Sequence, residues 1–182
     1  MIAALSALLF TAALAPGSTF TVDPSASTVT YHVVHKLHRV EGVSQTIEGK
    51  AVAKDDVTVL AMVRIPVSTF HSGDANRDAH MLEVMEVGKH PFVVFKGLSR
   101  LRRGADLTAG KASMQGEVEL HGVKVPVTVP LTVEERDGAI RVRGHFDLSL
   151  EAHRVERPSL LFVKIDDACG IDVDLLLRKQ ER

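Results

Sequence analysis

The sequence lacks the residues on which several classes of site depend. Tryptophan is absent, Tyr31 is the one tyrosine, and aromatic residues make up 4% of the 182 residues. The single cysteine, Cys169, excludes an intrachain disulfide and a zinc site built from cysteines. Its neighbours Ile171, Val173 and Leu175 share its strand parity and are apolar. We therefore predict an aliphatic core in which Cys169 is an inert thiol.

An excess of charge of one sign is also missing. The chain has 22 Lys and Arg against 23 Asp and Glu, a formal net charge of −1. This balance gives no general attraction to nucleic acid or to an anionic membrane surface, so neither is a predicted partner. The basic cluster Arg100–Arg103 is too short, and too poor in aromatics, to indicate nucleic-acid binding. Nucleophile elbows, phosphate-binding loops and dinucleotide fingerprints are absent from the sequence.

Long apolar runs are confined to the beginning of the chain. Met1–Ala15 is uncharged and apolar, but a bilayer span needs about 20 such residues. It resembles the apolar region of a secretory signal, with Ala13 and Ala15 as the small residues of a cleavage site, although no Lys or Arg precedes it. We predict a signal peptide over residues 1–18 with an open cleavage site, and a periplasmic or secreted domain over residues 19–182. A buried N-terminal helix is the alternative.

What the sequence does contain is alternation. Met114–Leu150 alternates apolar and polar residues almost without a break, which is the period of strands with one buried face. His121-Gly122 and Asp137-Gly138 interrupt it where hairpin turns are expected. Pro126 and Pro130 fall on the outward parity, and they indicate a weakly paired stretch or a bulge. The segment therefore predicts a three-stranded antiparallel meander with an apolar face.

Further strands flank this meander. Val57–Pro66 is apolar on both parities, which predicts a strand buried on both faces or covered by another element. Ser68–Glu86 loses the alternation and predicts a turn and a short helix capped by Asp74. Ala152–Asp167 has no clear period. The other expected strands are Thr19–Asp23, Thr28–Lys36, Ser44–Ala53, Phe92–Ser99 and Ala168–Leu177. About eight antiparallel strands predict a sandwich or a barrel, whose lumen is filled or holds one small ligand.

Three histidines near the second strand are candidate metal ligands. On a strand His32 and His35 point to opposite faces, and His38 lies roughly 20 Å from His32 at 3.2–3.4 Å per residue. We therefore predict no metal site among them.

Arg77, Asp78 and His80 on the predicted helix were weighed as catalytic groups. Asp78 and His80 are two residues apart and do not face each other on a helix. We predict a polar helix face on which Arg77 is tied to backbone or to a carboxylate, and no catalytic residue. A hydrolase that depends on His80, Asp78 or His35 is the enzymatic alternative.

Several motifs in order resemble the YceI family of lipocalin-like, polyisoprenoid-binding proteins. They are the strand Val29–His35 followed by Gly42, the helix Asn76–Leu82 with its Arg-Asp-x-His, the segment His90–Phe95 with its Pro-x-x-x-Phe, and the hairpin Gly116–Val127. The resemblance spans about Phe20–Leu177. It implies an all-β, lipocalin-like, eight-stranded antiparallel barrel with a short helical insertion. Many members carry Arg-x-x-Phe-Gly after the last hairpin, where this chain reads EAHRVERPSLLF, so its barrel mouth is expected to differ.

The resemblance also implies a function without catalysis. The barrel lumen would bind, sequester or transport an amphiphilic lipid, such as an isoprenoid- or quinone-like molecule, with no other cofactor. A homodimer is compatible with it, and a filled barrel that serves as a stress-response scaffold is the non-binding alternative. From strand parity, the predicted lumen residues are Tyr31, Val33, Val118, Leu120, Val142, Phe146, Leu148 and Val173, with Met81 and Phe95 reaching the lumen from the helix and a neighbouring strand.

Overall fold

The computed structural model of the chain describes residues 15–35, 38–100, 110–136, 138–157, 159–160 and 163–180. Most of the predicted signal peptide lies outside these ranges, so that prediction stays untested. The strands are β1 (Thr19–Val22), β2 (Thr28–His35), β3 (His38–Ser44), β4 (Glu48–Ala53), β5 (Thr58–Pro66), β6 (Phe92–Arg100), β7 (Lys111–Leu120), β8 (Val123–Arg136), β9 (Ala139–Ser149), β10 (Ser159–Leu160), β11 (Val163–Lys164) and β12 (Ala168–Lys179); the helical elements are η1 (Pro24–Ala26), η2 (Val67–Thr69) and α2 (Ala75–Val84).

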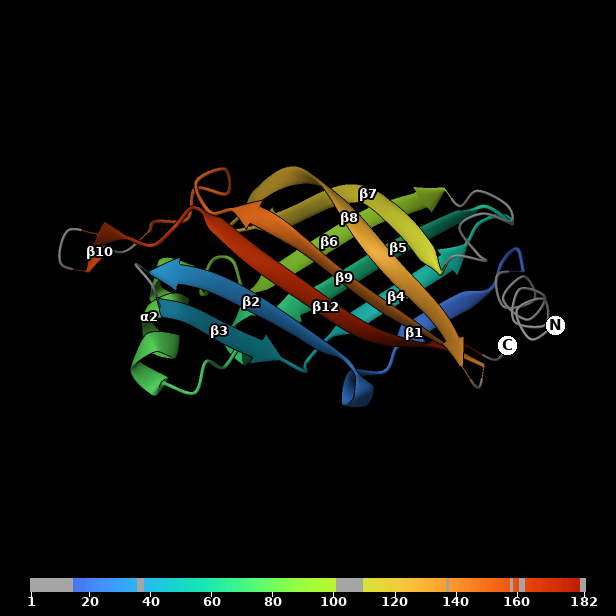
Figure 1. The fold of residues 1–182 in the computed structure, drawn as a ribbon, viewed down its shortest axis with the longest axis horizontal. Helices are drawn as coiled ribbons and strands as arrows, with labels where there is room; N and C mark the ends of the chain where they lie inside the picture. The colour runs from blue at the N-terminus through green and yellow to red at the C-terminus, as the bar shows by residue number, and fades with distance from the viewer. Residues whose placement is uncertain are drawn as a thin grey trace.

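Eight of the strands close into an antiparallel barrel, as the sequence predicts. The ring runs β1-β4-β5-β6-β7-β8-β9-β12, and β1 closes it by pairing with both β4 and β12. β1 pairs with residues 177–179 at the end of β12. After the turn at η1, β2 pairs with residues 170–174 of β12, and β3 pairs with β2. The barrel is elongated, and α2 packs at one end of it (Figure 1). We call this the α2 end.

The weak pairing that the two prolines predict is found in β8. Its pairing with β9 covers Leu131–Arg136 alone, so Pro126 and Pro130 have no ladder to complete on that side. Residues 150–157 turn back at this place. The ring of His153, which has no exposed surface, contacts the carbonyl oxygens of Ser149 and Val118 at 2.8 and 3.3 Å. This contact joins the end of β9 to β7.

Helix α2 begins as expected. The Asp74 carboxylate accepts hydrogen bonds from the backbone N–H groups of Asn76 and Arg77, at 3.0 and 3.1 Å, and thus satisfies two donors that a helix start leaves open. Helices long and apolar enough to cross a bilayer are not found in the part of the chain that the structure describes.

The sheet differs from the prediction in two places. The strand β3 was not foreseen, because HRVEGVS is mostly polar; Gly42 is needed there, since a Cβ would lie 2.3 Å from the ring of Tyr31 on the paired strand. Strand β5 is not covered on both faces: its outward Leu60 and Met62 are 39% and 46% exposed. With Leu98 on β6 they form an apolar outer surface, and the homodimer stays a prediction.

Candidate functional site

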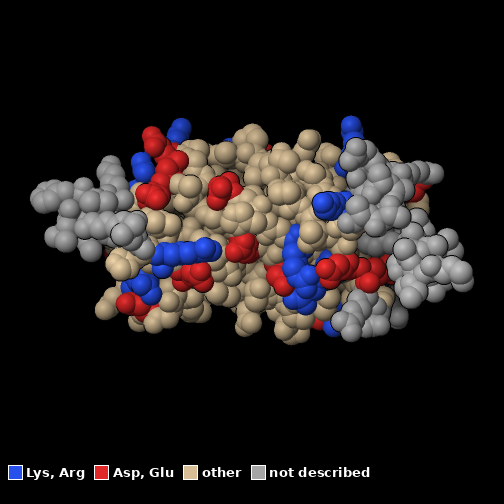
Figure 2. Space-filling model, viewed as in Figure 1, with Lys and Arg blue, Asp and Glu red and all other residues tan. Residues whose placement is uncertain are grey.

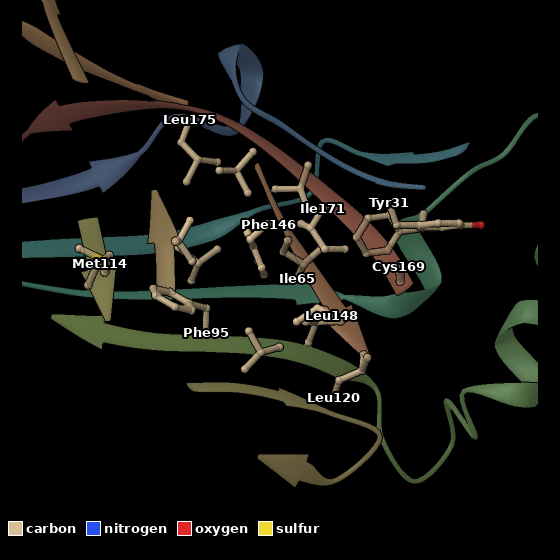
Figure 3. A pocket seen from close by; sticks show the side chains of 18 of the residues that line it. Tyr31, Ile65, Phe95, Met114, Leu120, Phe146, Leu148, Cys169, Ile171 and Leu175 are labelled. Atoms are coloured by element: carbon tan, nitrogen blue, oxygen red, sulfur yellow. The ribbon is translucent and has the colours of Figure 1, made fainter. Parts of the chain in front are cut away.

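The barrel encloses a cavity of about 380 Å³. Side chains from opposite walls, among them Phe95, Leu120, Phe146 and Ile171, point into the same space (Figure 3). These side chains come from inward positions of the strands, so period-two alternation in the sequence becomes the lining of the lumen.

All ten residues that the sequence predicts for the lumen lie on the cavity wall. Met81 reaches it from α2 and the others reach it from strands. Their contact with a ligand stays a prediction. The ten are Tyr31, Val33, Met81, Phe95, Val118, Leu120, Val142, Phe146, Leu148 and Val173.

Small residues explain why the lumen is not filled. Ala51 on β4 pairs with Ala61 on β5, Ala61 pairs with Gly97 on β6, and Gly97 pairs with Gly116 on β7. The two alanines line the cavity with methyl groups alone, which leaves the lumen wide beside them. The two glycines instead let the wall pack closely, because a Cβ at Gly97 would lie 2.5 Å from the ring of Phe95 and one at Gly116 would lie 2.2 Å from the carbonyl oxygen of Lys96. This row is set by strand register, which the local pattern of a single strand does not give.

The cavity wall offers few polar groups. At the end away from α2, Ser99 is 3% exposed, and its hydroxyl has no hydrogen-bond partner among the described residues. Lys50 and Lys111 also line the wall, while Arg77, His80 and Glu156 line it at the α2 end. A buried hydroxyl without a partner is uncommon, so Ser99 is a place where a polar group of a ligand would be satisfied.

Tyr31 and Cys169, two ionisable groups on the cavity wall, stay neutral. Burial raises the pKa of Tyr31, with a smaller contribution from the charge of Asp78. Burial likewise raises the pKa of the Cys169 thiol to about 12. A thiol of this pKa is protonated at neutral pH and is a poor nucleophile, which agrees with the inert cysteine that the sequence predicts.

The catalytic candidates do not converge. Asp78 accepts hydrogen bonds from the backbone and hydroxyl of Ser72, which hold the pKa of Asp78 below its usual range. Arg77 donates to the Ser72 carbonyl oxygen at 3.1 Å, as the polar-face interpretation expects. His80 lies 3.6 Å from Glu83 on the exposed side of α2. The side chain of His35 lies outside the described residues. Asp78 therefore has a structural role, because it connects the first turn of α2 to Ser72 in the preceding loop.

Solved structures similar to this chain share its fold. BcnA of Burkholderia cenocepacia matches with a TM-score of 0.71 and 19% identity, over 85% of this chain and 98% of that one. A polyisoprenoid-binding domain from Saccharophagus degradans, implicated in plant cell wall breakdown, matches with a TM-score of 0.73 and 16% identity, over 88% and 98%. A YceI protein of Campylobacter jejuni matches with a TM-score of 0.55 and 12% identity, over 68% and 73%.

Sequence comparison identifies the family. The search among curated proteins gave no match. The family model described as the YceI-like domain matches residues 20–177, from the first strand of the barrel to the end of its last. The motifs, the closed barrel and this match agree, and the chain belongs to the YceI family.

Proposed function

We propose that the barrel binds an amphiphilic lipid with a long apolar chain, such as an isoprenoid- or quinone-like molecule, and carries or sequesters it without catalysis. The observation that supports this most is the cavity of about 380 Å³ behind an almost wholly apolar wall. Its volume falls within the roughly 300–1,000 Å³ of small-molecule sites. The similar structure from Saccharophagus degradans is described as a polyisoprenoid-binding domain.

The wall favours a hydrocarbon chain over a polar ligand. Each methylene group moved from water into such a lumen contributes about 0.8 kcal/mol, so several isoprene units outweigh the cost of ordering the chain. Polar contacts come from Ser99 and Lys111 at one end and from Arg77, His80 and Glu156 at the other. Affinity would then depend on the chain, and the polar ends of the lumen would accept the head group.

The alternative functions find less support. A scaffold needs a lumen filled by its own side chains, whereas this barrel has a cavity of about 380 Å³ that the methyl groups of Ala51 and Ala61 border. A hydrolase needs converging groups, but Asp78 and His80 engage different partners.

We also propose that the protein works in the periplasm after export. Expression of the intact chain, followed by N-terminal sequencing of the secreted product, would test this.

Native mass spectrometry and solvent extraction of the purified protein test the proposal. We expect a bound species that organic solvent releases and that contains a long apolar chain. A protein that carries no lipid and takes up no fluorescent isoprenoid alcohol would leave the filled scaffold as the better description.

A pair of neighbouring residues offers a matched variant and control. Ala61 faces the lumen and Leu60 faces solvent. Ala61→Phe places a ring in the cavity and is expected to reduce isoprenoid uptake at least about tenfold, the effect of about 1.4 kcal/mol. Leu60→Phe adds a similar ring outside the barrel and is expected to leave uptake unchanged. Equal uptake by both variants would place the ligand elsewhere.

A further inference from the structure

Three side chains with metal-binding atoms meet outside the lumen, at the α2 end of the barrel. Glu86 follows α2, His90 precedes β6, and His121 lies in the turn between β7 and β8. One ligand atom from each lies within 4.8 Å of the other two. The Nε2 atom of His121 is 3.3 Å from Oε2 of Glu86, and the two imidazole rings are 5.0 Å apart in an edge-to-face arrangement.

Among the described residues, the His121 ring makes no hydrogen bond that would explain its position. Both its nitrogens are buried, and Oε2 of Glu86 lies 3.3 Å from Nε2. Buried polar atoms without partners cost free energy and ask for an explanation. Lys89 holds Oε1 of Glu86 at 2.8 Å, and this bond keeps the pKa of Glu86 below its usual range. The other carboxylate oxygen, Oε2, is left facing His121.

The backbone at the site also favours residues other than those present. Glu86 has a φ of 44° at the position after α2 where glycine is usual, and the backbone bonds from Val87 to Leu82 and from Glu86 to Glu83 form the helix-ending motif that demands it. His121 has a φ of 52° in a two-residue hairpin turn, where asparagine is preferred. Such strain is typical of functional positions.

Glycine at position 122 makes room for the third member. A Cβ there would lie 2.6 Å from Cε1 of His90, and the φ of Gly122 is 74°. The same glycine therefore completes the turn that carries His121 and admits the ring of His90. The backbone N–H of His90 donates to the Glu86 carbonyl oxygen at 3.0 Å, which fixes the turn between these two ligands.

We propose that Glu86, His90 and His121 bind one Zn²⁺ ion or a similar transition-metal ion, with a fourth position open to water. Two imidazoles and one carboxylate are a common zinc ligand set, whereas Mg²⁺ and Ca²⁺ prefer oxygen atoms alone. Bonds of 2.0–2.2 Å in a tetrahedron separate ligand atoms by about 3.4 Å. The 3.3 Å between His121 and Glu86 already fits that separation.

An ion at this site would join two parts of the chain. Glu86 and His90 belong to the connection between α2 and β6, and His121 belongs to the rim of the barrel. Since Met81 of α2 and Met85 just after it line the cavity, the ion would hold the helix in place over that end of the lumen.

Titration of the full chain with Zn²⁺, purified without a histidine tag, tests the site. By calorimetry we expect one ion per chain, and by visible absorption we expect the spectrum of tetrahedral Co²⁺ when Co²⁺ is used instead. Glu86→Gln and His121→Asn are each expected to weaken Zn²⁺ binding at least about tenfold, and asparagine suits the turn, so the second variant is expected to fold.

His80→Gln is the matched control, because His80 is a histidine of the neighbouring helix α2 that lies outside the cluster and contacts Glu83 at 3.6 Å. It is expected to leave Zn²⁺ binding unchanged, and Mg²⁺ is expected to produce no heat. Absence of Zn²⁺ binding by the parent protein, or binding that persists in both ligand variants, would overturn the proposal. His90→Gln decides the matter in the same way if either variant fails to fold.

Discussion

Two groups of histidines and carboxylates differ in how completely they satisfy one another. The first crosses the outer face of the sheet from β3 to β9, where basic and acidic side chains lie beside one another (Figure 2). Nε2 of His32 lies 2.5 Å from Asp172, whose other oxygen contacts His145 at 2.6 Å. Nδ1 of His32 accepts from Arg39 at 3.2 Å, and Glu41 lies 3.2 Å from the same nitrogen. A partner thus exists for His32 in either protonation state.

The second group, Glu86, His90 and His121, has similar residue types, but its hydrogen-bonding atoms are less completely satisfied. The His121 side chain is 14% exposed against 9% for His32, but its two ring nitrogens are buried and make no hydrogen bond to any described residue. Glu86 and His121 are also two of the three non-glycine residues with positive φ among the described residues. Composition therefore does not separate a structural cluster from a binding site; unmet nitrogens and backbone strain do.

The largest expected effect follows from removing the carboxylate of the satisfied group. Asp172→Ala leaves the buried Nε2 of His32 without its acceptor, and we expect a loss of about 1–3 kcal/mol in the free energy of unfolding. Urea denaturation measures it. Thr132→Ala, on the outer face of β8, is a control that removes a weak 3.4 Å bond to a backbone carbonyl and should cost far less. Equal losses in the two variants would contradict the importance of the His32 contact.

The same contact predicts a dependence on pH. Burial tends to raise the pKa of Asp172, but hydrogen bonds from His145 and His32 outweigh it and hold the pKa below the usual 3.8. A carboxyl group whose pKa is lowered by folding stabilises the fold above its unfolded pKa, and this contribution is lost as the pH falls through the folded pKa. The difference in unfolding free energy between the parent and Asp172→Ala should therefore shrink below about pH 4. A difference that grows with acid would contradict the assignment.

In the second group, replacement of the strained residue Glu86 should raise the free energy of unfolding. Glu86→Gly removes a side chain from a left-handed position, and we expect about 1 kcal/mol of added stability when a chelator removes metal ions. Glu83→Gly, inside α2, is the control and should cost about 1 kcal/mol. Thermal unfolding of both variants provides the comparison. Destabilisation of similar size in both would show that Glu86 carries no strain.

Much of the barrel could be predicted from the sequence because a strand's inward face is a local property. Alternation in Met114–Leu150 assigns each side chain to a face without knowledge of its neighbours, and the wall residues on β7 and β9 follow from it. Turns at His121-Gly122 and before Gly138 follow from local conformation as well. Strand β3 could not be predicted, because its pairing with β2 holds a polar sequence in place.

The site at the α2 end depends on the pairing of two strands. Glu86 and His90 are close in the sequence and suggest a pair, but His121 meets them only because β6 and β7 are neighbours in the sheet. Sequence reasoning weighed His32, His35 and His38, which are close in the chain, and passed over this set. One local signal was available: a histidine occupied the turn position that asparagine usually takes.

The smallest expected effect concerns His145, the exposed member of the satisfied group. Its ring is 58% exposed and shares Asp172 with His32, so water can replace it. His145→Asn should change the free energy of unfolding by less than about 0.5 kcal/mol. It should also leave Zn²⁺ binding unchanged. His145 is a histidine next to a carboxylate, but that carboxylate, Asp172, already contacts His32 and is not free to bind a metal ion. Weakening of Zn²⁺ binding as large as that of His121→Asn would show that hydrogen-bond saturation does not decide which group binds metal.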